Sequence, residues 1–87
     1  MNRNAQVWQA EGDQLAHMAP HIISTGIRAA AEAVADHIIN HPSSYHASRG
    51  SVAVHVYEMD WATVSYCDDN GTRRVFDVTP RRTEIAV

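Results

Sequence analysis

The chain has 87 residues, of which 45% are hydrophobic, and its formal net charge at pH 7 is −3. This length predicts one small domain over residues 1–87, and the apolar content is typical of a folded protein rather than a disordered one. The negative charge argues against nucleic acid as a partner, because nucleic-acid binders usually present a basic face.

The composition also bears on location. No run approaches the ~18 apolar residues of a membrane span, so we expect no membrane partner. The N-terminal residues lack the apolar core of a signal peptide, and the single cysteine, Cys67, cannot form an internal disulfide. Together these features predict a cytoplasmic protein.

Residues 1–12 are weakly patterned, with Val7 and Trp8 as their large apolar side chains and Gly12 as an interruption. We predict a flexible N-terminal segment, in which Trp8 either folds back onto the domain or anchors a partner. A short helix from Asp13 to Met18 can follow, with Asp13 as its N-cap.

Apolar residues at helical spacing predict the main helix, from about Pro20 to Asn40. Gly26 weakens this helix and indicates a kink or a join between two shorter helices. Pro42 ends it, because the residue before a proline avoids helical angles. One stripe of the helix holds Ile23, Ile27, Ala30, Ala31, Val34 and Ile38.

After a polar linker at 42–50, apolar residues alternate and predict three strands, at about 51–57, 61–68 and 72–79. Asn70-Gly71 predicts a hairpin, and a three-residue loop with Gly71 left-handed pairs Val64 with Phe76. This register gathers the apolar side chains on one face. Thr79-Pro80 is expected to break the third strand, and 83–87 to form either a fourth strand or a tail.

The expected fold is therefore α+β: one main helix, with a short helix before it, packed on a three-stranded antiparallel meander. The sheet face away from the helix would carry a mixed polar surface. Aromatic and arginine side chains are enriched at binding hot spots, which makes the surface residues and both tryptophans candidates for partner contacts. These candidates are His55, Tyr57, Val75, Arg73, Trp8 and Trp61.

The favoured function is a small non-enzymatic protein–protein interaction module, an inhibitor or adaptor of bacterial or phage origin. Its partner would be another protein or a second copy in a homodimer. By analogy only, phage inhibitors of host defence, such as anti-CRISPR proteins, are similar in their small size and lack of catalytic motifs. No phosphate loop or catalytic constellation is present in the sequence, so we expect no cofactor.

Two histidine pairs, His17 with His21 and His37 with His41, have the spacing that lets a helix share a metal ion. Neither pair has a third ligand at motif spacing, so we expect no metal site, and a His-mediated metal-binding module stays an alternative function. Turn chemistry accounts for Asp68-Asp69.

A second alternative comes from the C-terminal half. A helix followed by antiparallel strands over Thr63–Glu84, with Asp68-Asp69-Asn70-Gly71 and a basic Arg81-Arg82 end, is similar to the topology of RelE/ParE toxins. That resemblance implies a ribonuclease acting on translation, so the question of enzyme activity stays open. The resemblance also implies a leading strand, which the sequence does not show, and a basic chain, which this one is not.

Overall fold

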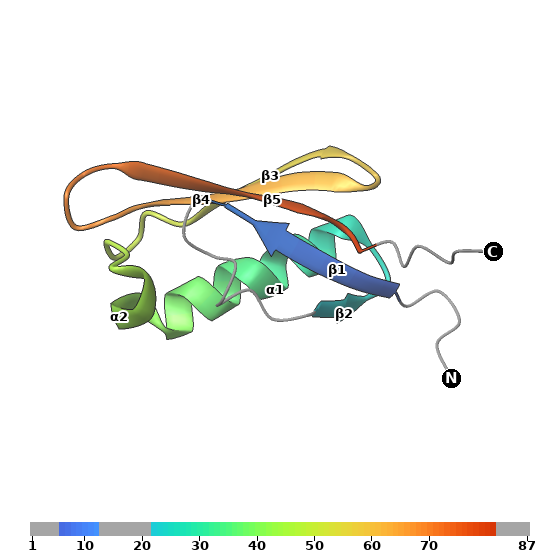
Figure 1. Cartoon of the computed structure of the whole chain (residues 1–87), viewed down its shortest axis with the longest axis horizontal. Coiled ribbons are helices and arrows are strands. Elements are labelled where there is room, and N and C mark those ends of the chain that lie inside the picture. Colours follow the sequence, from blue (N-terminus) through green and yellow to red (C-terminus); the bar gives the residue numbers. More distant parts are fainter. Residues whose placement is uncertain (1–5, 13–21, 82–87) are drawn as a thin grey trace.

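The computed structural model describes residues 6–12 and 22–81. Within these ranges, five strands form one antiparallel sheet in the order β2-β1-β5-β4-β3, and the main helix lies across one of its faces (Figure 1). The elements in chain order are β1 (Gln6–Glu11), β2 (Ile22–Ser24), α1 (Ile27–Asn40), α2 (Pro42–Tyr45), β3 (Ala53–Glu58), β4 (Trp61–Cys67) and β5 (Arg73–Pro80).

The prediction of a three-stranded meander is wrong, because the sheet has two further strands, β1 and β2. Residues predicted to be flexible form β1, which lies between β2 and β5 and pairs Trp8 with Ile22 on one side and with Pro80 on the other. Backbone bonding to two neighbours fixes this strand. The alternation of buried residues along β1 is short, with only Trp8 and Ala10 buried, and therefore did not predict a strand from the sequence.

The predicted start of the main helix is also wrong. Ile22–Ser24 is strand β2, and the helix begins at Ile27 after Gly26, which adopts an extended conformation as N-cap rather than a kink. Ile23 therefore leaves the helical stripe and is 73% exposed, whereas the remaining stripe residues are buried. The predicted end at Asn40 is confirmed, and Pro42 opens the short helix α2 inside the predicted linker.

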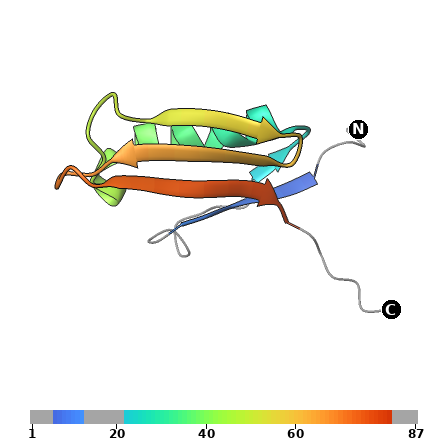
Figure 2. The ribbon, with the colours of Figure 1, turned by 90° about the horizontal axis from the view of Figure 1, so that it is seen from above.

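The predicted register of the C-terminal hairpin is confirmed. Val64 pairs with Phe76 and Ala62 with Val78, and Gly71 has a φ of 79°, in the left-handed region. The third predicted strand is shifted by one residue, and the expected break at Thr79-Pro80 is wrong, because β5 continues through Pro80 alongside β1. Figure 2 shows β3, β4 and β5 running side by side, with β3 at the free edge.

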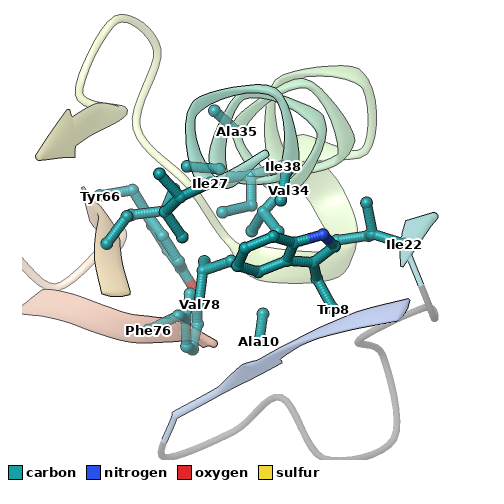
Figure 3. Packing of buried hydrophobic residues seen from close by; sticks show 14 of the residues in the cluster. Trp8, Ala10, Ile22, Ile27, Val34, Ala35, Ile38, Tyr66, Phe76 and Val78 are labelled. Atoms are coloured by element: carbon teal, nitrogen blue, oxygen red, sulfur yellow. The ribbon is translucent and has the colours of Figure 1, made fainter. Parts of the chain in front are cut away.

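The core lies between the sheet and α1 (Figure 3). Its largest fully buried side chains are Trp8, Tyr66, Phe76, Ile38, Val64 and Val78. Trp8 is 1% exposed, and its indole N–H donates a hydrogen bond of 3.1 Å to the Ser24 carbonyl oxygen. Trp8 therefore joins β1 and β2 to the core.

Gly12 closes β1 where the backbone passes close to Phe76. A Cβ atom at residue 12 would lie 1.8 Å from the Phe76 ring and 2.8 Å from the Val75 carbonyl oxygen. Only a residue without a side chain fits this crossing. No helix in the described part of the chain is long and apolar enough to cross a bilayer. The predicted helix at 13–18, the pair His17 and His21, and the segment 83–87 lie outside the described residues.

Candidate interaction surface

Strand pairing fixes which side chains share the sheet face opposite α1, here called the outer face. His55 lies opposite Thr63, Thr63 opposite Asp77, and Asp77 opposite Glu11, so one row of side chains crosses β3, β4, β5 and β1. Directly opposed residues point to the same side of a sheet. The next row, toward the β4–β5 turn, holds Ala53, Ser65 and Val75.

Alternation places Tyr57 on the same face as His55, and a β-bulge lies beside it. The register of β3 against β4 shifts between Val56 and Glu58, so Tyr57 and Glu58 both stand against Trp61. A bulge inserts one extra residue and re-aims the side chains beside it. Tyr57 thereby stacks on Trp61, with ring centroids 4.5 Å apart and planes 24° apart.

Three rings form a continuous group, here called the aromatic patch: His55, Tyr57 and Trp61. The His55 and Tyr57 rings are 6.3 Å apart and 23° from parallel. The indole N–H of Trp61 donates a hydrogen bond of 3.0 Å to Oδ1 of Asp77 on β5. Stacking and this hydrogen bond hold the rings in one arrangement while their outer surfaces face solvent.

Large apolar side chains are exposed within the patch and elsewhere on the outer face and its β3–β4 turn. Tyr57 is 55% exposed, Trp61 38% and Val75 48%. Met59, in the β3–β4 turn, is 90% exposed. Exposed apolar groups that gather on one side of a small domain are typical of an interaction site, whereas single ones are ordinary.

The structure places five of the six predicted partner-contacting residues on the outer face. His55, Tyr57 and Trp61 form the aromatic patch, and Val75 lies on β5. Arg73 lies at the other end of β5, where its guanidinium donates a hydrogen bond of 2.8 Å to Ser65 Oγ. Trp8 is the exception. It is buried in the core, so a surface anchor at this residue is wrong.

Sequence reasoning missed Met59 and the bulge at Tyr57. It also left out Asp77, whose carboxylate orients Trp61. Alternation along a strand cannot reveal a bulge, because the extra residue is defined only by the pairing with the neighbouring strand.

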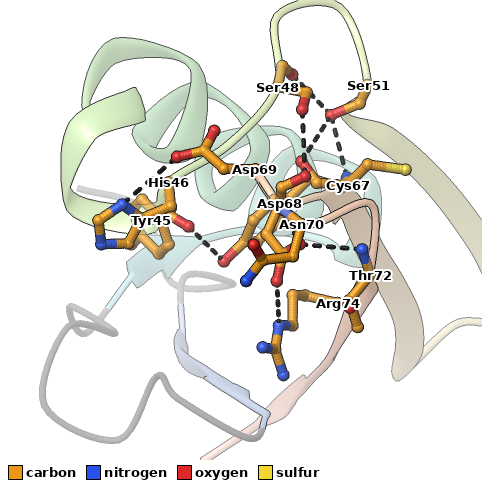
Figure 4. Close-up of polar contacts among 11 residues, drawn as sticks. Tyr45, His46, Ser48, Ser51, Cys67, Asp68, Asp69, Asn70, Thr72 and Arg74 are labelled. Atoms are coloured by element: carbon orange, nitrogen blue, oxygen red, sulfur yellow. Dashed lines mark hydrogen bonds and ion pairs between the residues drawn. The ribbon is translucent and has the colours of Figure 1, made fainter.

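The opposite end of the hairpin carries a polar network (Figure 4). Asp68 is 6% exposed and accepts hydrogen bonds from the backbone N–H groups of Asn70 and Thr72, both at 2.9 Å. Its other oxygen pairs with Nε of Arg74 at 3.0 Å. The Thr72 bond, together with those from Asn70 and Arg74, lowers the pKa of Asp68 against the opposing effect of burial.

This network borders a cavity of about 320 Å³, lined by Tyr45, His46, Asp68, Asp69, Asn70 and Arg74. The lining groups serve the turn itself: Nδ1 of His46 lies 3.6 Å from Oδ2 of Asp69, and Tyr66 donates a hydrogen bond to the Tyr45 carbonyl oxygen at 3.1 Å. We interpret the network as the device that closes the β4–β5 turn against α2.

The candidate metal pair, His37 and His41, lies at the C-terminal end of α1. The two rings stack with centroids 4.4 Å apart, and Nδ1 of His37 lies 2.6 Å from the Tyr45 hydroxyl oxygen. Burial, and then the neighbouring His41, lower the pKa of His37. In the described part of the chain no third His, Cys, Asp or Glu joins them, and a zinc site needs three or four ligands.

Arginines within the span of the toxin resemblance, Thr63–Glu84, are partly engaged within the fold. Arg74 pairs with Asp68, Arg73 bonds Ser65, and the main chain of Arg81 donates to the Val7 carbonyl oxygen at 2.7 Å. Arg82 lies outside the described residues. The ribonuclease interpretation stays a prediction.

Comparison of the chain with protein-family models, with curated proteins and with solved structures finds no match. A function for this chain is therefore argued from its own surface, in which the aromatic patch is the most distinctive feature.

Proposed function

We propose that the protein is a non-enzymatic protein–protein interaction module, an inhibitor or adaptor, that binds its partner through the outer face around the aromatic patch. The observation that supports this most is the exposed stack of Tyr57 on Trp61, held by the Trp61–Asp77 hydrogen bond. Tyrosine and tryptophan are the residue types most enriched at binding hot spots.

The arrangement favours binding because the rings are already ordered before a partner arrives. An immobilised side chain loses on the order of 1 kcal/mol of conformational freedom on binding, and a ring that is fixed in advance loses less. The polar rows beside the patch, including Thr63 and Asp77, would supply the rim that surrounds an apolar interface centre.

The proposal is tested by affinity capture with matched variants. Tagged wild-type protein should retain a partner that Tyr57→Ser and Trp61→Ser lose, by at least about tenfold in affinity for hot-spot residues. The control is Ile39→Ser, because Ile39 is 55% exposed but lies on α1, away from the outer face.

Equal capture by the wild type and by both outer-face variants would reject the outer face as the binding surface. Arrest of translation on expression of the wild type would favour the toxin interpretation instead.

A further inference from the structure

Strand β3 lies at one edge of the sheet that the described residues form. It pairs with β4 on one side, and no other described strand pairs with it. Free edge strands present backbone N–H and C=O groups that can pair with another chain, and proteins usually block them with lysine, proline, an inward-pointing charge or a β-bulge. The segment Ala53–Glu58 contains neither lysine nor proline, its single carboxylate is at the last residue, and its bulge lies beyond Val56, so the first four residues of the strand are regular.

The side chains of β3 that face α1 are only partly covered. Val54 and Val56 pack against the core yet keep intermediate exposure, whereas Val64 on the neighbouring β4 is fully buried. The difference follows from position, because an edge strand has no neighbour to cover its outer flank. A further strand beside β3 would bury this apolar surface, which favours pairing.

The charges at the two ends of β3 indicate what that further strand is. Arg49 precedes β3, while Glu58 and Asp60 lie at its end, and all three residues are exposed. If two copies of β3 run antiparallel, the cationic start of each strand approaches the anionic end of the other. A parallel pair would place like charges together, which is unfavourable.

Register follows from side-chain parity. Residues that lie opposite one another must point to the same sheet face, so the two-fold axis passes through one residue of β3. With the axis at Val54, the paired segment within β3 is only three residues long, from Ala53 to His55. With the axis at Val56, Val54 of one copy lies opposite Glu58 of the other, and the bulge falls inside the paired segment. With the axis at His55, Val54 of each copy lies opposite Val56 of the other copy.

We propose that two copies of this chain associate by antiparallel pairing of their β3 strands, with His55 opposite its counterpart on the two-fold axis. The two sheets then form one continuous sheet, with both α1 helices on one side. Both aromatic patches lie near the axis on the other side. The dimer would double the proposed binding surface, but it rests on the edge strand and not on that function.

The axis position is tested by charge exchange at His55. This side chain is exposed on the outer face, so His55→Glu and His55→Lys should both fold, which thermal unfolding followed by circular dichroism checks. Each variant alone places two like charges opposite one another and should weaken dimerisation on the order of tenfold in sedimentation equilibrium. Mixing the two variants should restore association, as a heterodimer seen by native mass spectrometry.

Val75→Glu is the matched control. Val75 is 48% exposed on the same face but lies on β5, away from the axis, so this variant should dimerise like the wild type. A wild type that stays monomeric at millimolar concentration would overturn the proposal. So would a Glu and Lys mixture that forms no heterodimer, or a Val75→Glu variant that dissociates as readily as His55→Glu.

These outcomes separate the dimer from the proposed function. Trp61 lies on β4, one strand away from the contact between copies, so Trp61→Ser should lose the partner and keep the dimer. A monomeric wild type that still loses its partner on Trp61→Ser would reject the dimer alone.

Discussion

The two turns that close β4 differ in how they use their polar and apolar groups. At the β4–β5 turn, Asp68 is buried and its carboxylate bonds to Asn70, Thr72 and Arg74 within the fold. At the β3–β4 turn, Met59 is 90% exposed and the Tyr57 and Trp61 rings face solvent. Both turns join strands of the same antiparallel sheet. The β4–β5 turn, here called the closed turn, makes its polar contacts within the fold, whereas the β3–β4 turn, here called the open turn, leaves apolar side chains in solvent.

This difference separates residues that hold the fold from residues that remain for a partner. A buried carboxylate must be satisfied by hydrogen bonds, so the β4–β5 turn is committed to structure. An exposed, pre-stacked aromatic group contributes little to folding beyond its own stack, because its outer surface stays in water. The comparison predicts stability effects at the core and at the closed turn, and binding effects at the open one.

The largest expected effect on stability comes from the core tryptophan rather than from the exposed one. Trp8→Ala should lower the free energy of unfolding by about 3–5 kcal/mol, because it removes a buried ring and leaves a cavity. Chemical denaturation measures the loss, and Trp8→Phe gives a second, milder variant in case the alanine variant does not fold. A change below about 1 kcal/mol would contradict the placement of Trp8 in the core.

A smaller loss is expected at the closed turn, and it should depend on pH. Since hydrogen bonds hold the pKa of Asp68 below its ordinary value of 3.8, its contribution is present above that value. It is lost as pH falls from 3.8 through the pKa of the folded state, because the unfolded chain binds the proton first. Asp68→Asn should destabilise the protein at pH 7. The same variant should lose less stability than the wild type as the pH falls below 3.8.

The exposed neighbour Asp69 serves as the control for this measurement. Asp69→Asn should leave the acid unfolding profile steeper than Asp68→Asn does. Identical profiles for the two variants would show that the network around Asp68 does not carry the effect.

His37 should produce a separate and weaker effect at milder pH. Its pKa in the folded state lies below the ordinary value of 6.5, so the unfolded chain is protonated first as pH falls. Stability should therefore decline below pH 6.5, and His37→Gln should remove part of that decline. His55→Gln is the comparison variant, and thermal unfolding at a series of pH values between 7 and 5 distinguishes the two.

The smallest effect on stability is expected at the open turn. Tyr57→Ser should change the free energy of unfolding by about 0.5 kcal/mol or less, because the ring is mostly in solvent. The same variant should show the loss of partner capture described above. A large destabilisation without any change in binding would mean that the aromatic patch serves the fold and would remove the contrast between the two turns.

Much of the C-terminal half could be predicted from sequence. The pairing of Val64 with Phe76 and the left-handed Gly71 follow from a two-residue period and from local turn chemistry. The sequence also assigned the candidate residues Tyr57 and Trp61 to the surface. It could not predict that their rings stack, because the bulge beside Tyr57 is defined only by the pairing of β3 with β4.

The N-terminal half shows the opposite result. Ile22–Ser24 continues the helical spacing of α1 but forms a strand, because β1 supplies a neighbour for its backbone. Trp8 lies in the short strand β1, and the pairing of this strand with β5 decides whether its side chain is buried or exposed. Neither outcome is encoded in a local period, so tertiary context overrides the pattern.

By itself, the amino-acid sequence determined the faces of the last three strands, the register of the last two and the end of the main helix. Alternation, the Asn70-Gly71 turn and Pro42 act over a few neighbouring residues. Only the tertiary structure decided that β1 and β2 complete the sheet, that the helix begins at Ile27, and that Trp8 is buried. The reason is that backbone hydrogen bonds between distant segments satisfy donors and acceptors that no local pattern assigns.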